Sequence, residues 1–358
     1  MVRQNGNDQD WLQRMWYGNS ASRFLLMPLS LIFSAVVSLR RWLYRIGVLK
    51  SYRMSVPVVV VGNITVGGTG KTPITIWLAQ ELKIRGHNPG IVSRGYGGKV
   101  GRTAIEATAF SSPDTVGDEA ILIASRSRCP VFVHPDRVAA ARAAIDSGVD
   151  IIIADDGLQH YRLARDYEIA VLDGLRGSGN GLLLPAGPLR EPMERLQFVD
   201  RVLVQTEGQD VDVPFLRRLA DRSSSAFTLV PKQLRELNGM ARRPLGEFSG
   251  KTVHAVAAIG NPTRFFRMLE SHGMRVIPHA YRDHLPLTGK HLAFGDGLPI
   301  VMTEKDAVKC GGLSVDNCWY VPVTVKFPNA GRSNWLEELH NFLLKKKEEL
   351  CPNVNSTS

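Results

Sequence analysis

Short apolar stretches alternate with segments of helical periodicity between residues 56 and 206. Strands that are separated by helices in this way form mainly parallel sheets, with helices packed on both faces. The predicted strands are Val56–Val61, Pro89–Ser93, Val131–Val133, Asp150–Ala154, Glu168–Leu172 and Arg201–Gln205, with helices that include Pro73–Arg85, Gly117–Ser125 and Asp136–Ser147. The pattern therefore predicts an α/β domain over residues 56–206.

The pattern becomes weaker and more polar after this domain. Residues 207–251 predict a connecting segment with room for a strand pair near Ala226–Pro231. Apolar stretches and helical periodicity then return, which predicts a smaller C-terminal α/β domain over residues 252–349 and a polar tail over residues 350–358. The expected strands of this domain are Thr252–Ile259, Met274–His279, Pro299–Thr303 and Trp319–Val325, and its expected helices are Pro262–His272, Gly289–Leu292 and Asn334–Glu349.

A third pattern precedes both domains, in residues 1–55. Residues 24–37 are apolar apart from two serines and a proline, and arginines and aromatic residues flank the run on both sides. The run is shorter than the ~20 residues that a membrane-spanning helix needs, and no signal-peptide cleavage site follows it. We therefore predict a helix that lies in or dips into one leaflet and is held by arginines on anionic lipid. The alternative is a buried helix packed on the soluble domain.

Composition narrows the class of partner. A chain of 358 residues with 44% hydrophobic and 22% charged residues suits a globular protein of two domains. Its net charge of +10 favours an anionic partner: nucleic acid, an acidic membrane or a phosphorylated substrate. The positive charge is scattered, without zinc-ligand spacing or a basic surface interleaved with aromatic residues, which argues against nucleic acid. The spacing of the four cysteines fits no metal site, and a reduced cytosolic setting is expected.

A glycine-rich turn follows the first predicted strand of the sheet and leads into a helix. Such a turn lets successive backbone N–H groups converge on phosphate oxygens, while a lysine and a Mg²⁺-binding hydroxyl complete the cradle. One position departs from the general motif, because Thr65 stands where the first glycine is usual. The turn predicts a P-loop NTPase-like fold that binds a nucleoside triphosphate through Thr65, Val66, Gly67, Gly68, Thr69, Gly70, Lys71 and Thr72.

Two neighbouring acids, Asp155 and Asp156, end an apolar strand at the same edge of the predicted sheet. Ligands of such sheets collect at the carboxyl ends of the strands, and Mg²⁺ prefers one or two carboxylates with water and phosphate oxygens. The pair therefore predicts a magnesium site. The alternative is a turn or a helix cap.

Seven motifs together resemble one family, tetraacyldisaccharide 4'-kinase, the lipid A kinase of Gram-negative envelopes. They follow the order of that family from the N-terminal region to about Lys309, and Thr65 in the phosphate-binding loop is part of the family's pattern. The motifs are Gly62-Asn63 with Gly67–Pro73, Ser93-Arg94-Gly95-Tyr96-Gly97, Val116-Gly117-Asp118-Glu119, Asp155–His160, Leu184–Glu191, Asp283-His284 and Thr303–Lys309.

The resemblance implies a reaction: transfer of the γ-phosphoryl group of ATP, with Mg²⁺, to the 4'-hydroxyl of a tetraacylated glucosamine disaccharide 1-phosphate. It places the enzyme at the cytoplasmic face of the bacterial inner membrane, with the lipid as its partner and no obligatory protein partner. By resemblance, Asp118 and His284 act together as the base on the sugar hydroxyl. The residues alone also allow a surface histidine and a helix-capping aspartate.

The same resemblance assigns roles to the other motif residues. Lys71 and Arg190 meet phosphate, and Glu191 helps Thr72 and the aspartate pair to organise the metal. The residues alone allow Arg190 and Glu191 to be an exposed surface pair, and Arg94 and Tyr96 to be part of a flexible turn. The residues expected to contact the acceptor substrate are Asn63, Arg94, Tyr96, Glu119, Gln159 and His160.

Two other functions compete with a kinase. The first is a P-loop switch or partition-type ATPase at the membrane, which would hydrolyse ATP without lipid and phosphorylate nothing. A GTPase is a poor match, because Thr303-Glu304-Lys305-Asp306 lacks the Asn-Lys-x-Asp spacing that guanine recognition requires. The second is a nucleic-acid-binding ATPase, which would bind DNA in a salt-sensitive manner as strongly as it binds anionic liposomes.

Overall fold

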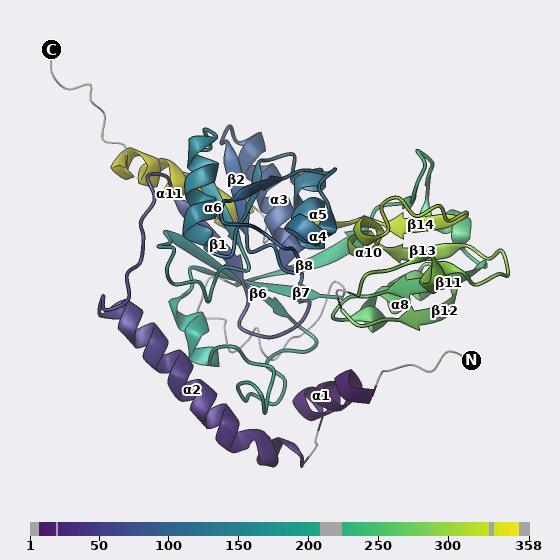
Figure 1. The fold of residues 1–358 in the computed structure, drawn as a ribbon, viewed down its shortest axis with the longest axis horizontal. Helices are drawn as coiled ribbons and strands as arrows, with labels where there is room; N and C mark the ends of the chain where they lie inside the picture. Colours follow the sequence, from purple (N-terminus) through teal and green to yellow (C-terminus); the bar gives the residue numbers. More distant parts are fainter. Residues whose placement is uncertain (1–6, 19–20, 208–223, 284, 329–332, 351–358) are drawn as a thin grey trace.

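The computed structural model describes residues 7–18, 21–207, 224–283, 285–328 and 333–350. Two sheets lie side by side and form two α/β units (Figure 1). The larger sheet has nine strands in the order β15 (Val323–Lys326), β8 (Ser224–Pro231), β7 (Arg201–Thr206), β6 (Tyr167–Asp173), β1 (Val58–Gly62), β5 (Ile151–Asp155), β2 (Pro89–Ser93), β4 (Val131–Val133) and β3 (Ile105–Ala107). Only β3 and β15, at the two edges, pair antiparallel.

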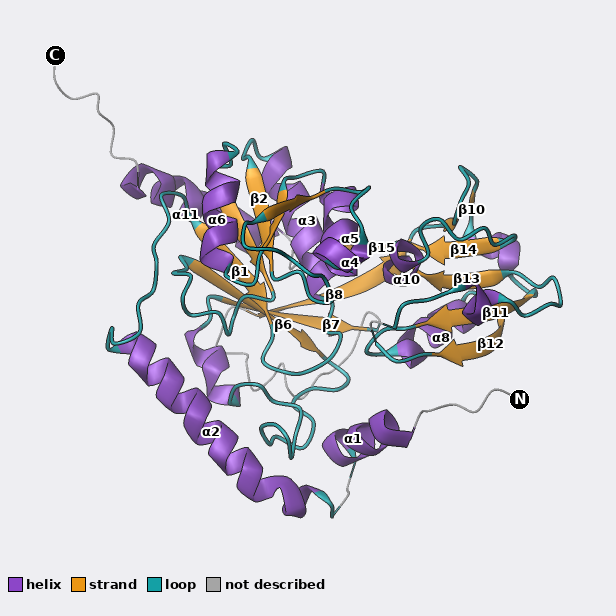
Figure 2. Cartoon of the chain, viewed as in Figure 1, coloured by secondary structure: helices purple, strands orange, loops and turns teal. Residues whose placement is uncertain are grey.

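Burial on both faces explains the continuous apolar runs of the central strands. Alternate residues of β1 enter two different cores: Val59 and Val61 face one side, and Val58 and Val60 face the other. The first core includes α3 (Lys71–Ile84) and α5 (Asp118–Ser127), and the second includes α6 (Arg137–Asp146). The mainly parallel sheet with helices on both faces is therefore confirmed (Figure 2). Short turns α4 (Pro113–Val116) and η1 (Met193–Phe198) complete this unit.

The smaller sheet has six strands in the order β10 (Arg242–Arg243), β9 (Leu234–Glu236), β14 (Cys318–Val321), β13 (Ile300–Thr303), β11 (Thr252–Ala257) and β12 (Arg275–Ala280). Its central strands β11 to β14 pair in parallel, whereas β9 and β10 are antiparallel. The remaining elements of this unit are η2 (Leu245–Phe248), α8 (Pro262–Ser271), α9 (Gly289–Leu292) and α10 (Glu304–Lys309).

The two sheets divide the chain differently from the predicted boundaries. Strand β8, in the predicted connecting segment, belongs to the larger sheet, and the chain then enters the smaller one at β9. The single strand predicted at Trp319–Val325 is wrong, because β14 ends before Pro322 and β15 returns to the larger sheet. Proline lacks the N–H that a continuous ladder would need. Helix α11 (Ser333–Leu350) then packs Trp335 into the core of the larger sheet beside Trp77.

The N-terminal region forms α1 (Asn7–Tyr17) and α2 (Arg23–Arg45). Helix α2 continues past the apolar run to 23 residues, so by length and composition it could cross a membrane, contrary to the estimate from the run alone. Only 6% of its most apolar window is buried, which contradicts the alternative of a buried helix. It lies along the outside of the larger unit (Figure 1). An exposed apolar stripe at helical spacing runs along it: Leu25, Leu29, Ile32, Val36 and Leu39.

Candidate functional site

The phosphate-binding loop joins β1 to α3, and hydrogen bonds from Asn63 and to the Pro188 carbonyl fix its path. Gly67 and Gly70 have φ values of 110° and 86°, a left-handed region that favours glycine. The buried Asn63 side chain donates to Thr69 Oγ1 at 3.3 Å, and the Val66 N–H donates to the Pro188 carbonyl at 2.8 Å. The loop therefore opens at the N-terminus of α3, where backbone N–H groups and the helix dipole favour an anion.

One cavity of about 1980 Å³ extends from this loop to helix α2. It brings together the phosphate-binding loop, the ends of the central strands, the apolar flank of α2 and part of the smaller unit. Among the predicted residues that line it are Lys71, Thr72, Arg94, Tyr96, Glu119, Asp155, Asp156, Gln159, His160, Arg190 and Glu191, and α2 contributes Phe33, Val36, Val37 and Arg40. Asn63 and Asp118 are buried outside this lining.

The aspartate pair lies beside Lys71 at the mouth of the phosphate-binding loop. Asp155 accepts a hydrogen bond from Thr75 Oγ1 at 2.9 Å. Asp156 lies 3.6 Å from Lys71 Nζ and 3.1 Å from an Arg190 guanidinium nitrogen. Arg137, which the sequence analysis did not single out, donates to the carbonyl oxygens of both aspartates and fixes the turn. The exposed surface pair suggested for Arg190 and Glu191 is therefore wrong.

The charges of this pair fit a divalent cation. Burial, Glu119 and Asp156 raise the pKa of Asp155 to about 7. Burial also acts against ionisation of Asp156, but Lys71 and Arg190 outweigh it and lower the pKa to about 2. Asp155 is a buried carboxyl group next to two further acids, Glu119 and Asp156. A bound cation would stabilise the ionised form of such a group. Within the described residues no cluster of three metal-ligating side chains occurs, so water and phosphate oxygens would complete the coordination.

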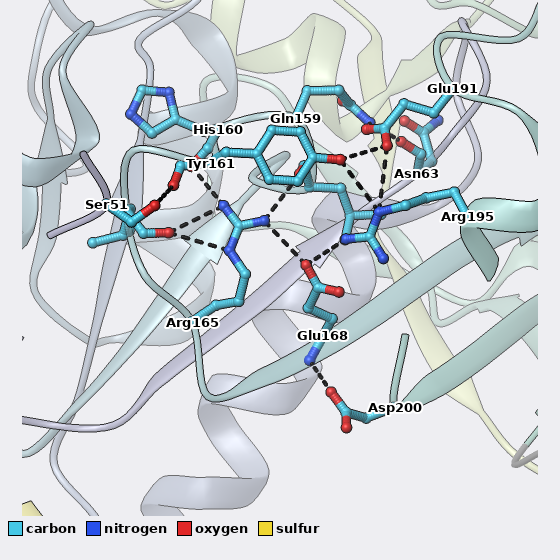
Figure 3. Close-up of polar contacts among 12 residues, drawn as sticks. Ser51, Asn63, Gln159, His160, Tyr161, Arg165, Glu168, Glu191, Arg195 and Asp200 are labelled. Carbon is cyan, nitrogen blue, oxygen red and sulfur yellow. Dashed lines mark hydrogen bonds and ion pairs between the residues drawn. The ribbon is translucent and has the colours of Figure 1, made fainter. Parts of the chain in front are cut away.

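Glu191, expected near the metal, is buried in a hydrogen-bond network with Gln159, Tyr161 and Arg195 (Figure 3). One oxygen accepts from Gln159 Nε2 at 2.8 Å, and the other accepts from the Tyr161 hydroxyl at 2.6 Å and lies 3.3 Å from Arg195 Nε. Gln159 Nε2 also donates to the Asn63 carbonyl at 2.9 Å. Glu191 thus connects the turn after the aspartates to the start of the phosphate-binding loop.

Asp118 begins helix α5 at the boundary between the two units. The N-cap is Gly117, whereas the Asp118 carboxylate accepts from the Glu119 N–H at 3.0 Å. Lys309 Nζ of α10 lies 3.8 Å from the Asp118 carboxylate, and Lys305 Nζ donates to Glu119 at 2.9 Å. His284, the predicted partner of Asp118, lies outside the described residues, although the preceding residue lines the cavity.

A model of the tetraacyldisaccharide-1-P 4'-kinase family matches residues 22–341. The chain belongs to this family. A tetraacyldisaccharide 4'-kinase of Alkalilimnicola ehrlichii is 49% identical over 93% of this chain and 97% of the relative, and one of Nitrosococcus oceani is 44% identical over 93% and 95%. Among solved structures, an "apo" form of LpxK from Aquifex aeolicus in complex with ATP is similar, with a TM-score of 0.69, 26% identity, and coverage of 90% of this chain and 98% of that one.

Several residues of this 4'-kinase site were not assigned from its sequence. Tyr161 and Arg195 matter only through the network around Glu191, and they lie too far apart in sequence for spacing to reveal it. Lys305 and Lys309 belong to a motif that carried the family resemblance but received no role. Their spacing of four residues on one helical face was the available signal.

Proposed function

We propose that this protein is an ATP-dependent kinase that phosphorylates the 4'-hydroxyl of a tetraacylated glucosamine disaccharide 1-phosphate, a step of lipid A biosynthesis. Membership of the family supports the reaction. The observation that carries it is the single cavity that joins the phosphate-binding loop to the apolar helix α2. A kinase for a soluble sugar would not need an exposed apolar stripe beside its acceptor space.

The donor half of the site follows from the phosphate-binding loop. We propose that residues 65–72 bind the β- and γ-phosphates of ATP, with Lys71 neutralising charge that develops on transfer. Arg190 is held beside Lys71 by Asp156, and its guanidinium is suited to the transferred phosphoryl group. Thr72, Asp155 and Asp156 would hold Mg²⁺, which supplies further neutralisation of phosphate charge when bound. Glu191 supports these residues through Gln159 and Tyr161 rather than through the metal.

The acceptor half lies toward α2 and the smaller unit. We propose that Asp118 and His284 accept the proton of the sugar hydroxyl, as the resemblance implies. Arg94, Tyr96, Glu119, Gln159 and His160 line the acceptor side of the cavity, and buried Asn63 acts through the phosphate-binding loop. Burial and Arg137 lower the pKa of His160 to about 4, so this side chain is a neutral hydrogen-bonding group near pH 7.

The membrane is the proposed source of the acceptor. The stripe on α2 would lie among acyl chains, while the arginines at its C-terminal end, among them Arg40, Arg41 and Arg45, would meet anionic headgroups. We propose that the enzyme acts at the cytoplasmic face of the bacterial inner membrane. Neither nucleic acid nor an obligatory protein partner is part of the proposal.

The decisive experiment supplies γ-labelled ATP, Mg²⁺ and the tetraacylated disaccharide 1-phosphate in mixed micelles, followed by chromatography of the lipid. We expect one new labelled lipid that carries a second phosphate. ATP hydrolysis that is independent of lipid, with no labelled lipid, would favour the switch-type ATPase instead. Omission of Mg²⁺ and the K71A variant serve as controls.

A further inference from the structure

Helix α10 carries two lysines across the boundary between the units to the start of α5. Lys305 Nζ donates to Glu119 Oε1 at 2.9 Å and lies 3.6 Å from the Asp283 carboxylate. Lys309 Nζ lies 3.8 Å from Asp118 Oδ2. Both units thus contribute charged groups to one cluster beside the proposed base.

The Lys309 ammonium group is fixed from its own side. It donates to Asp306 Oδ1 at 2.8 Å and to the Ala258 carbonyl at 3.0 Å. Asp306 is fully buried, and its other oxygen accepts from the Ala258 N–H at 3.0 Å and from Thr303 Oγ1 at 2.6 Å. These contacts restrict the Lys309 side chain to a conformation in which its ammonium group faces Asp118.

Burial makes this contact energetically important. The Lys309 and Asp118 side chains are 6% and 7% exposed, so solvent screens their attraction only weakly. Four carboxylates, those of Asp118, Glu119, Asp283 and Asp306, share the two ammonium groups. Removing Lys309 would take a positive charge from beside the buried Asp118 carboxylate, and burial favours the protonated form of a carboxyl group.

We propose that Lys309 is a positioning residue of the kinase, which holds the Asp118 carboxylate ionised and aimed at the acceptor from the opposite unit. Lys305 assists by tying Glu119 to Asp283 across the same boundary. The proposal rests on the proposed function, because it needs Asp118 to act on the sugar hydroxyl. Lys309 itself lies outside the cavity lining and acts through Asp118.

The test compares K309M and K309R in the lipid phosphorylation assay with a matched lysine-to-methionine control away from the site. The control is K347M, which removes the ion pair between Lys347 of α11 and Asp150, two residues outside the cavity lining. We expect K309M to lower kcat about a hundredfold with the KM for ATP changed less than about threefold, because charge at the base is lost while the nucleotide site is intact. K309R should recover most of the rate, and K347M should keep kcat within about threefold of wild type.

A double-mutant cycle separates positioning through Asp118 from general damage. In a D118N background, we expect K309M to change kcat by less than about threefold, because the group on which it acts is already absent. Wild-type kcat in K309M, or a loss that multiplies in full with that of D118N, would overturn the inference. If K309M does not fold by circular dichroism, K309Q replaces it under the same criteria. Failure of the wild-type enzyme to label the lipid would instead refute the proposed function.

Discussion

Acidification should weaken the attachment of α11 to the larger unit through His87. This side chain is 5% exposed; its Nε2 lies 2.8 Å from His340 Nδ1, and its Nδ1 lies 2.7 Å from Lys347 Nζ. Lys347 also forms an ion pair with Asp150 at 2.6 Å. The lysine donates to Nδ1, so a neutral His87 protonated at Nε2 satisfies the whole chain of contacts. Burial and then Lys347 lower the pKa of His87 from 6.5 to about 4.

The sign and size of the effect follow from linkage. Between pH 6.5 and pH 4 the unfolded chain binds a proton at this site and the folded chain does not, so the free energy of unfolding falls as pH falls. From pH 7 to pH 5, a pKa displaced from 6.5 to about 4 corresponds to a loss of about 2 kcal/mol. His160 adds a loss of the same sign, because its pKa is also lowered to about 4.

The assay is urea unfolding at pH 7, 6 and 5, for wild type and for H87Q. Trp77 and Trp335 pack together where α11 meets the larger unit, so tryptophan fluorescence reports this region. We expect wild type to lose about 2 kcal/mol more than H87Q over this range, whatever the stability of H87Q at pH 7. The contribution of His160 cancels, because both proteins contain it. Equal pH slopes for the two proteins would refute the assignment of a neutral, buried His87.

Three further predictions concern activity and location. K71A should lower kcat by more than about a hundredfold in the lipid phosphorylation assay, because the positive charge of Lys71 offsets the negative charge of the transferred phosphate. Turnover within about tenfold of wild type would exclude the phosphate-loop assignment. Y161F should lower kcat about tenfold through the lost 2.6 Å hydrogen bond to Glu191 with the Mg²⁺ dependence unchanged, whereas a large rise in the Mg²⁺ requirement would indicate that Glu191 ligates the metal. L25D combined with I32D, on the exposed stripe of α2, should shift the protein from the membrane to the soluble fraction with nucleotide binding retained, and an unchanged membrane fraction would contradict an interfacial α2.

The central sheet was predictable from sequence because its strands are buried on both faces. Residues 58–61 and 151–154 are apolar throughout, and burial on both faces is what such runs require. The route of the chain between the two sheets was not predictable. Strands β8 and β15 pair with each other although nearly one hundred residues separate them, and no local pattern encodes such a partner. The length of α2 was underestimated because arginines interrupt its last turns, although no helix-breaking residue separates these turns from the apolar run.

Some residues of the candidate site could likewise be predicted from the sequence, and others could not. Residues of the phosphate-binding loop and the aspartate pair could be assigned because they follow strands of one parallel sheet, whose carboxyl ends meet at one edge. Glu191 could be found by resemblance, but its contacts with Tyr161 and Arg195 depend on a loop whose path the sequence does not specify. The contact of Lys309 was even harder to predict from the sequence, because its partner Asp118 lies in the other unit.

The route of the chain also explains why charge is concentrated where α10 meets α5. Two connections, from β8 to β9 and from β14 to β15, join the units on the side of the larger sheet that ends in β15. Ion pairs from Lys305, Lys309 and Glu304 then fix α10 against α5. Charged contacts have directional partners, whereas an apolar interface would tolerate small displacements. Such contacts let a residue of one unit fix the position of a side chain in the other, and a misplacement of about 1 Å in an active site can cost a hundredfold in rate.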